Sequence, residues 1–345
     1  MSLSYIERLP TELIQPIFLA SGPNLALPLT SHYIAAKLSH KSTYYAVCTQ
    51  YLKKRLIHNP NVSLNQTRLF ASKWMTWEYF KSFLFDAFEH IGCLCGKTAQ
   101  EGCFDAQWPP NFEDATAMTF SRSHCPALTF VKCRLPVKLL HGPWTQDKIQ
   151  FLRFLLWMTS MTVEWANPEV LNIVREGRRQ AFLEKNLEAV QLFNHNRRLG
   201  RSPDLGSVRF AVIEADCVRS IVYDTMASAR LSGSRGRDWD CAELDEWCEK
   251  RIEAGDPKGT WLKVKLQELR QVDIFKSRDG DYERKIYGEM NAETGDYDDE
   301  GDELVINDLN WNKVRNFSPV PRHTYNPSMV VPPYWYVRLY LCGSE

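Results

Sequence analysis

The sequence has three shortages, and each one excludes a class of protein. Its 42 Lys and Arg residues balance 42 Asp and Glu residues, so no net charge favours binding to nucleic acid or an anionic membrane. Its longest apolar stretch, residues 151–163, is too short to span a bilayer and contains Arg153. Ten cysteines lack the spacing of a disulfide framework, and the start MSLSYIERLP is not a signal peptide. We expect a protein of the cytoplasm, the nucleus or both, with reduced thiols.

Catalytic signatures are also missing. No Ser-His-Asp ordering, His-Glu-x-x-His motif or paired-carboxylate pattern is specific enough to indicate catalysis. The stretch GCLCGKT has three residues between Gly92 and Gly96, whereas a nucleotide phosphate loop has four between its glycines. We therefore expect a protein that is not an enzyme. A hydrolase or transferase whose site has no local motif is the alternative.

Two segments have residue types that suit metals, but neither has a metal-binding pattern. His90, Cys93, Cys95 and Cys103 could bind zinc, with Cys125 and Cys133 as remote candidates. However, their spacing is Cys-x-Cys rather than the Cys-x-x-Cys of zinc sites. Asp296 begins an acidic run that resembles a calcium loop, but Asn307 stands where such a loop has a bidentate Glu. We expect no metal, no cofactor and free cysteines.

Hydrophobic residues make up 44% of the 345 residues, which predicts a globular protein with sizeable cores. Their spacing predicts a mainly α fold. We divide the chain into residues 1–60 with three short helices, a helical and irregular connection at 61–135, a helical array at 136–275, and a region at 276–345. In that last region, RKIYGEM and DELVIND predict a hairpin and YWYVRLYLC predicts a strand.

Helix boundaries in the first regions follow from capping residues and breakers. The first helix should begin at Pro10 and stop at the SGP of residues 21–23. The second should cover residues 24–39 with Asn24 as its cap, and the third residues 41–56. Residues 68–92 should form one aromatic-rich helix, and residues 93–128 a long irregular loop.

The stretch LPTELIQPIF carries more apolar side chains than one buried face needs. Leu9, Leu13 and Ile17 recur every fourth residue, and Ile14 and Phe18 lie one residue further. Such spacing predicts a broad apolar helix face. Pro16 falls inside this helix, where a proline removes a main-chain hydrogen bond. We predict that Leu13 and Ile17 face a partner or the edge of a groove.

LPTELIQPIF resembles the opening of an F-box, a three-helix domain, in the form found in filamentous fungi. Leu9, Pro10, Glu12, Leu13, Ile17 and Phe18 fill the family's pattern, and Leu25, Leu27 and Leu29 fall in the leucine positions of its second helix. Pro28 departs from the pattern. The resemblance implies binding to the small Skp adaptor of cullin ubiquitin ligases. The binding residues would be Leu9, Pro10, Leu13, Ile14, Ile17, Phe18, Leu25 and Leu29.

Two segments about thirty residues apart resemble each other. AFLEKNLEAVQLF at 181–193 aligns with AVIEADCVRSIVYDTM at 211–226, matching Ala181 to Ala211 and, with two residues inserted, Val190 to Val222. That spacing is typical of a helix-pair repeat, which buries its apolar faces by stacking. Two unrelated amphipathic helices are the alternative. We predict that the helices at 178–194 and 208–226 pack as neighbouring antiparallel pairs.

The first of these segments resembles an ankyrin repeat. Ala181, Leu187, Glu188, Val190, Leu192 and Phe193 fall in the ankyrin register, and Ala211, Ile221 and Val222 do so more loosely. Lys185 stands where the ankyrin family has glycine, and the Thr-Pro-Leu-His start is absent. Residues 138–156 are a candidate for a further degenerate unit. The resemblance implies an ankyrin-like array of two to four units.

Together the two resemblances imply a non-catalytic adaptor. The F-box would hold the Skp adaptor and, through it, a cullin ligase, and the array would hold a target protein for ubiquitin-dependent degradation. Other subunits would transfer the ubiquitin, so this chain would act by proximity alone. The rival is an ankyrin-like interaction scaffold that has no connection with ubiquitination.

Overall fold

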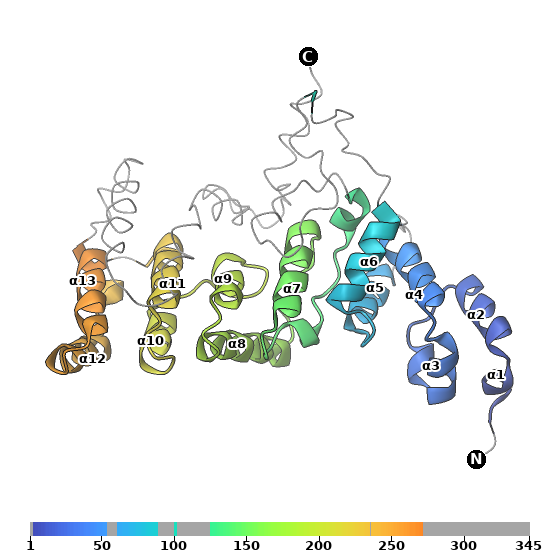
Figure 1. The fold of residues 1–345 in the computed structure, drawn as a ribbon, viewed down its shortest axis with the longest axis horizontal. Helices are drawn as coiled ribbons and strands as arrows, with labels where there is room; N and C mark the ends of the chain where they lie inside the picture. Colours follow the sequence, from blue (N-terminus) through green and yellow to red (C-terminus); the bar gives the residue numbers. More distant parts are fainter. Residues whose placement is uncertain (1–2, 54–60, 89–99, 102–124, 235, 272–345) are drawn as a thin grey trace. The chain divides into compact units, whose positions relative to one another are not determined.

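The computed structural model describes residues 3–53, 61–88, 100–101, 125–234 and 236–271. These residues are mainly helical, as the sequence predicted, and form thirteen α-helices with short 3₁₀ and π turns between them (Figure 1). Within the described ranges, extended backbone pairs at a single bridge, between Arg134 and Thr162. The hairpin and strand expected after residue 276 lie outside the described residues, as does most of the loop expected at 93–128. The described residues divide into two compact units: 3–140 with 145–171, and 141–144 with 172–271.

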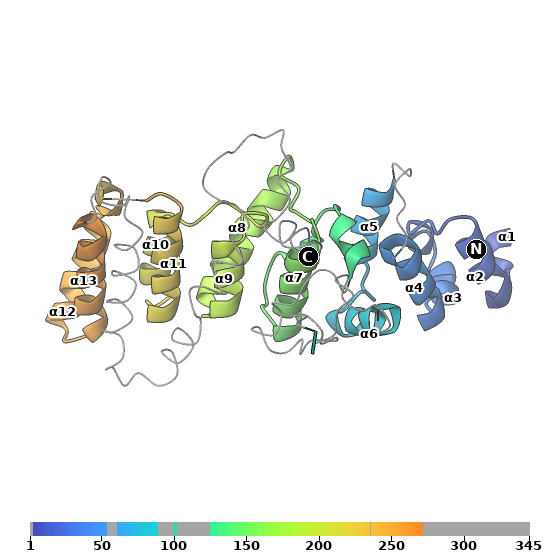
Figure 2. The ribbon, with the colours of Figure 1, turned by 90° about the horizontal axis from the view of Figure 1, so that it is seen from above.

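The first unit begins with four short helices. These are α1 (Tyr5–Arg8), α2 (Thr11–Ala20), α3 (His32–Leu38) and α4 (Lys41–Cys48), and a π turn at Thr49–Lys53 continues α4. Figures 1 and 2 both show α2 beside α3 and α4, which it contacts. Ser4 and Glu7 form a reciprocal capping box that starts α1. The helical character predicted for residues 1–60 is confirmed as far as residue 53.

The second helix starts later than the sequence predicted. Residues Leu27–Leu29 form a 3₁₀ turn, and α3 begins only at His32. Pro28 explains the difference, because its ring lacks an N–H and disfavours helical backbone at the preceding residue. Asn24 is not the cap that the sequence predicted: its side chain accepts from the N–H of Ala26 at 3.0 Å, one turn before the 3₁₀ helix, whose own N-cap Ala26 makes no side-chain capping bond. Ser31 caps α3 instead.

The expected helix at 68–92 is also two elements. The structure has α5 (Val62–Ala71), a break at residues 72–76, and α6 (Trp77–Phe88). In the break, Trp74 leaves the helical path and stacks on Tyr44 with ring centroids 4.1 Å apart. Helix α6 then packs against α7 (Gln146–Met158) around rings that include Phe80, Phe151 and Phe154. Every residue of α7 from 149 to 158 is buried, so α7 is the central helix of this core.

Residues 138–156 therefore form no helix pair. They contribute a 3₁₀ turn (Val137–Leu139) and α7, which belongs to the first unit. The second unit starts with residues 141–144, which are held against α8 (Pro168–Leu183). There the indole of Trp144 donates to the carbonyl of Gly177 at 3.0 Å, and the N–H of Gly142 donates to Gln180 at 2.7 Å.

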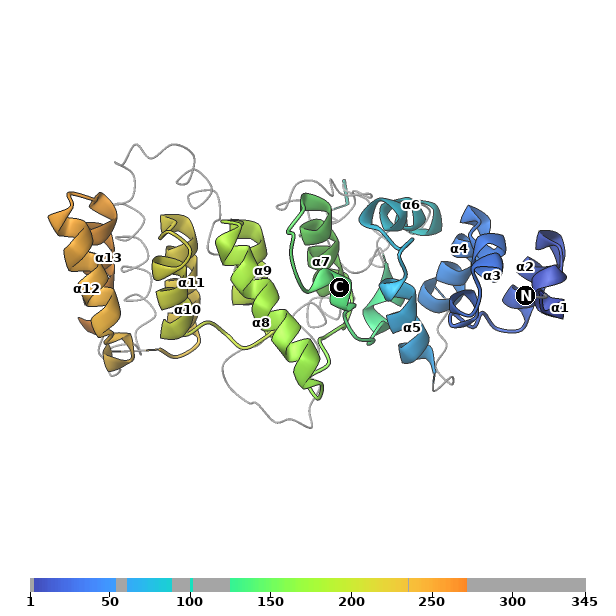
Figure 3. The same cartoon turned by 90° about the horizontal axis from the view of Figure 1, so that it is seen from below.

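Three consecutive helix pairs make up the rest of the second unit. They are α8 with α9 (Leu187–His195), α10 (Leu205–Ile213) with α11 (Arg219–Leu231), and α12 (Ala242–Glu253) with α13 (Pro257–Gln271). Figures 1 and 3 show α10 beside α11 and α12 beside α13. Helix α9 packs against α11, so the segments 178–194 and 208–226 are in contact, which confirms that part of the prediction. Their packing as antiparallel pairs stays a prediction. Short turns reverse the chain within each pair.

The turn inside each pair uses left-handed backbone. Lys185 has a φ of 53°, Asp216 a φ of 65° and Gly255 a φ of 75°. In the first and third pairs, a main-chain N–H bonds five residues back, Asn186 to Ala181 and Asp256 to Arg251. This is the Schellman pattern that ends many helices. Lys185 thus adopts the conformation that favours glycine, at the position where the sequence resemblance expected one.

Candidate protein-binding surface

Helix α2 is fixed in place by polar contacts at its start and middle. The carbonyl of Pro10 accepts from the N–H groups of Leu13 and Ile14, both at 3.1 Å. The Gln15 side chain donates to the carbonyl of Lys37 at 2.8 Å. In return, the Lys37 ammonium donates to the carbonyls of Glu7 at 2.6 Å and Leu9 at 2.7 Å. These contacts join α1, α2 and α3, so the orientation of α2 about its own axis is well defined.

The inner face of α2 is apolar. Ile14 and Phe18, four residues apart, are 2% and 4% exposed. They belong to a small core with buried side chains from the following segments, among them Leu25, Ile34, Leu38 and Val47. This core supplies enough burial to hold α2 against its own unit without help from the opposite face.

The outer face of α2 is apolar too. Leu13 is 52% exposed and Ile17 is 54% exposed, one helical turn apart. Pro16 and Ala20 are exposed on the same side, and Glu12 is the one charged residue among them. We call Leu13, Pro16, Ile17 and Ala20 the outer face of α2. A helix that is apolar all round is normally covered on all sides, so this face has the composition of a contact surface.

The structure divides the eight residues that the F-box resemblance proposed for partner binding. Pro10, Leu13, Ile17 and Leu29 are exposed, Leu9 is half-buried, and Ile14, Phe18 and Leu25 lie in the core of the domain itself. The expected exposure of Leu13 and Ile17 is confirmed. Leu29 lies on the 3₁₀ turn before α3 and is 83% exposed.

Four exposed apolar side chains near the N-terminus were not anticipated. Leu3 lies just before α1, Tyr5 and Ile6 lie on α1, and Tyr33 lies on α3. The Ser-x-x-Glu signature of a capping box at residues 4–7 could have revealed α1 from sequence. The Ser31 hydroxyl, which donates to Glu7, and the contacts with Ser4 lower the pKa of Glu7 to about 2. Glu7 therefore remains ionised and ties the start of α1 to α3.

A polar cluster of a different kind is buried in the second unit. Arg178 on α8 donates to Asn194 on α9 at 2.7 Å, and Asn194 donates to Asp224 on α11 at 2.8 Å. The other carboxylate oxygen of Asp224 bonds His195 at 2.8 Å. Burial alone would lower the pKa of His195, but the charge and hydrogen bond of Asp224 raise it above its ordinary value.

This His–Asp pair has the elements of a general base but lacks a nucleophile. The nearby hydroxyls of Thr225 and Ser228 both donate to main-chain carbonyls, of Ile221 and Asn194, at 2.7 Å. The Ser228 hydroxyl thus joins α11 to α9, and the Thr225 hydroxyl bonds within α11; neither donates to the imidazole ring. We interpret the cluster as a structural connection between neighbouring helix pairs. Sequence analysis missed it, because single polar residues thirty positions apart show no local pattern.

Metal ligands do not gather in the part of the chain that the structure describes. There, no group of three or more His, Cys, Asp or Glu residues could hold an ion. Cys125 and Cys133 are buried, and burial raises the pKa of Cys133 to about 12, so that thiol stays neutral. The other candidates, His90, Cys93, Cys95, Cys103, Gly92, Gly96 and Asp296, lie outside the described residues.

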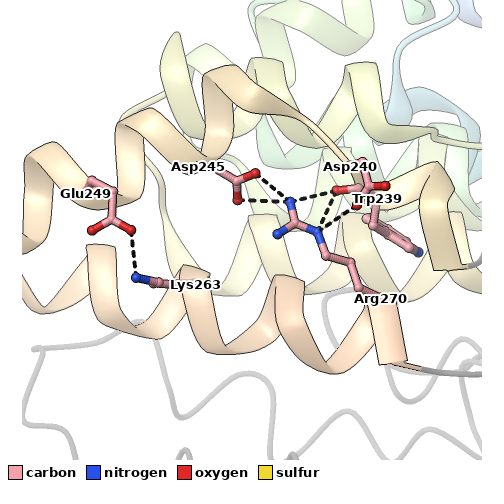
Figure 4. A network of polar contacts seen from close by, with 6 residues as sticks. All are labelled: Trp239, Asp240, Asp245, Glu249, Lys263 and Arg270. Carbon is pink, nitrogen blue, oxygen red and sulfur yellow. Dashed lines mark hydrogen bonds and ion pairs between the residues drawn. The ribbon is translucent and has the colours of Figure 1, made fainter.

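The exposed side chains of the pair α12–α13 are charged, whereas those on the outer face of α2 are apolar. Arg270 on α13 donates to both carboxylate oxygens of Asp245 at 2.9 Å and to the carbonyl of Trp239 at 3.1 Å (Figure 4). It also pairs with Asp240 at 3.3 Å, and Lys263 pairs with Glu249 at 2.6 Å. These contacts join the two helices along a solvated face.

Comparison with known proteins returns no relative: no protein family, no curated protein and no solved structure matches this chain. Among the described helices, none is both long enough and apolar enough to cross a membrane.

Proposed function

We propose that this chain is the substrate-receptor subunit of a Skp–cullin–F-box ubiquitin ligase. One observation carries the proposal: α2 buries Ile14 and Phe18 in its own core and exposes Leu13 and Ile17 on the other side. The sequence LPTELIQPIF, which resembles an F-box opening, is the stretch that produces this two-faced helix. The outer face would be covered by the Skp adaptor.

The outer face of α2 is too small to bind the adaptor by itself, so the contact must include further residues of this chain. Full burial of a Leu or Ile side chain contributes about 1.5–3 kcal/mol. Leu13 and Ile17 are already half-buried, so covering them adds about half of that each. Association itself costs several kcal/mol. The adaptor would therefore also have to cover neighbouring exposed residues, of which Leu29 is the most exposed among those the resemblance assigns.

The three helix pairs of the second unit would recognise the target. Stacked pairs that resemble ankyrin repeats offer a continuous surface on which a protein partner can bind. Holding a target close to the ubiquitin carrier would be its contribution to the reaction.

Replacing Leu13→Asp together with Ile17→Asp tests the proposal. A carboxylate forced into an apolar interface costs several kcal/mol, so we expect the double variant to lose co-purification with the Skp adaptor. The target should then accumulate, because it is still bound but no longer ubiquitinated. The matched control is Leu64→Asp with Leu183→Asp, two residues elsewhere that are 49% and 53% exposed. This control should keep the adaptor.

Adaptor binding that survives in a folded Leu13→Asp, Ile17→Asp chain would remove the F-box assignment. The second candidate, an ankyrin-like scaffold without any role in ubiquitination, would then stand. It is favoured by the observation that the helix pairs form a compact unit of their own. A scaffold of this kind should co-purify its partners equally well from wild type and double variant, and their abundance should not change.

A further inference from the structure

Positive charge gathers on one part of the second unit. Helix α8 places Arg175 one turn before Arg178 and Arg179, and the loop after α9 carries Arg197 and Arg201. Arg178 connects the two segments, since it donates to the carbonyl of Arg201 at 3.1 Å and to Asn194 at the end of α9 at 2.7 Å. We call these five arginines the basic surface. Four of them, Arg175, Arg179, Arg197 and Arg201, are exposed.

Asp204 and Asp224 offset part of the charge of Arg178, so the positive charge of the basic surface rests on its four exposed arginines. Both oxygens of Asp224 are occupied by Asn194 and His195, and Asp204 caps α10 by accepting from Ser207 at 3.0 Å. Burial lowers the pKa of Arg178 to about 10, which outweighs the opposing effect of Asp204 and Asp224. Glu176 is the one exposed acid between Arg175 and Arg178.

The side chains of Arg197 and Arg201 are available to a partner. Within the described ranges, no side-chain hydrogen bond or ion pair involves Arg197 or Arg201, while the loop that carries them is fixed by Arg178. The buried Nε of Arg178 itself has no hydrogen-bond partner among the described residues. A guanidinium group recognises carboxylates through charged hydrogen bonds. The basic surface is thus suited to an acidic peptide.

The chain itself contains a segment with that chemistry. Residues 289–308 include nine acidic residues and no Lys or Arg: Glu289, Glu293, Asp296, Asp298, Asp299, Glu300, Asp302, Glu303 and Asp308. They lie outside the described residues. Seventeen residues separate the end of α13 at Gln271 from Glu289, and a fully extended chain of this length spans about 60 Å. Neighbouring packed helices lie about 10 Å apart, so the distance from α13 past α11 to α9 is about 20 Å. The linker is long enough to cover it.

We propose that residues 289–308 bind the basic surface in the same molecule and compete there with an acidic segment of a partner protein. Each exposed ion pair is weak on its own, but the tether holds the segment at a high local concentration. Partners of low acidity would therefore fail to displace it, and raised ionic strength would release it. This inference does not depend on the Skp adaptor.

A labelled peptide of residues 289–308 tests the proposal by fluorescence anisotropy with full-length chains. In the open variant, the seven acids between residues 293 and 303 are replaced by Asn or Gln. We expect the open variant to bind the peptide at least about tenfold more tightly than wild type, because its basic surface is vacant. Adding Arg175→Gln, Arg197→Gln and Arg201→Gln to the open variant should weaken binding at least about tenfold. Raising the salt should have the same effect.

A matched control separates this surface from general charge. Lys41, Arg68 and Lys73 are exposed in the first unit, and replacing these three with Gln in the open variant should leave peptide binding unchanged. Should the arginine triple fail to fold, Arg197→Glu alone, at an exposed loop position, should still lower the affinity. Equal binding by wild type and the open variant overturns the proposal, as does equal loss in the control. Tighter binding of a single-stranded oligonucleotide than of the peptide would assign the surface to nucleic acid instead.

Discussion

Helices α2 and α12 each bury two side chains, but their exposed faces have opposite chemistry. Each buries two residues four positions apart, Ile14 with Phe18 in α2 and Leu244 with Cys248 in α12. On the outside, α2 shows leucine, proline and isoleucine, whereas α12 shows glutamates and lysine with ion pairs to its neighbours. The inner pair is therefore sufficient to dock such a helix. The side chains on the outer face are therefore available for contacts with another molecule. Of these two helices, α2 has the apolar outer face.

The inner positions of both helices should be the most sensitive to substitution. Truncating a buried Phe costs about 3–5 kcal/mol and a buried Leu about 2–5 kcal/mol. Phe18→Ala should therefore destabilise α2, and Leu244→Ala should destabilise α12, as measured by hydrogen exchange of each helix. Leu13→Ala, on the outer face, should cost under about 1 kcal/mol. An effect of Leu13→Ala as large as that of Phe18→Ala would mean that the two faces of α2 are not distinct.

The charged contacts that join α12 to α13 should contribute less. Arg270→Ala removes hydrogen bonds to Asp245 and to the carbonyl of Trp239, with Asp245 about half exposed. We expect a loss of about 1–2 kcal/mol, since bonds to charged groups are stronger than neutral ones but solvent screens this pair. Protection of the α13 amides should fall accordingly. The matched control Lys263→Ala removes only the exposed pair with Glu249 and should leave the protection of the α13 amides almost unchanged.

Giving α12 the outer chemistry of α2 is a direct test of the comparison. Glu246 and Lys250 form an exposed pair four residues apart, at 2.7 Å. Replacing both with Leu should leave the stability of the folded chain almost unchanged, because solvent screens an exposed ion pair. The variant should nevertheless self-associate at high concentration in sedimentation experiments, because it exposes a new apolar strip. Loss of folding instead would show that outer charge is needed to hold this helix.

The smallest effect should be a dependence of stability on pH that is found in the second unit and not in the first. The pKa of His195 is raised in the folded chain by Asp224, so its contribution to stability is present below about pH 6.5 and is lost as pH rises through the raised value. The protection factors of the α9 and α11 amides, which are corrected for the faster intrinsic exchange at higher pH, should be lower at pH 8 than at pH 6. His195→Gln should abolish this difference. A difference that persists in the variant would assign it to another group.

Local pattern was enough to predict some elements and not others. The helices after residue 136 and the contact between the repeated segments followed from apolar spacing. The start of α3 could not be predicted in this way. The apolar pattern runs on without a break, whereas Pro28 and the capping residue Ser31 delay the helix until His32. The break at residues 72–76 depends on Trp74 stacking on Tyr44, a contact between separate helices that no local signal reveals.

The candidate surface shows the same limit. Apolar spacing placed Leu13 and Ile17 toward a partner, and both are exposed. It placed Ile14 and Phe18 on the same partner-binding face, whereas the structure buries them in the core of the domain. The sequence could not predict which leucine after Pro23 turns inward. Leu25 is 9% exposed and Leu29 is 83% exposed, although only three residues separate them. The buried cluster of Asn194 and Asp224 required the stacking itself, since its members meet only across helix pairs.

Pro16 sets a condition on any molecule that covers α2. Because proline has no N–H, the carbonyl of Glu12 lacks the donor that a helix normally supplies four residues later. Glu12 and Pro16 are both exposed on the side of Leu13 and Ile17. An entirely apolar partner surface would exclude water from the carbonyl oxygen of Glu12. That oxygen would then lack a hydrogen bond, at a cost of about 1–3 kcal/mol. The molecule that fits best therefore brings a donor to this point among its apolar side chains, or leaves room for one water.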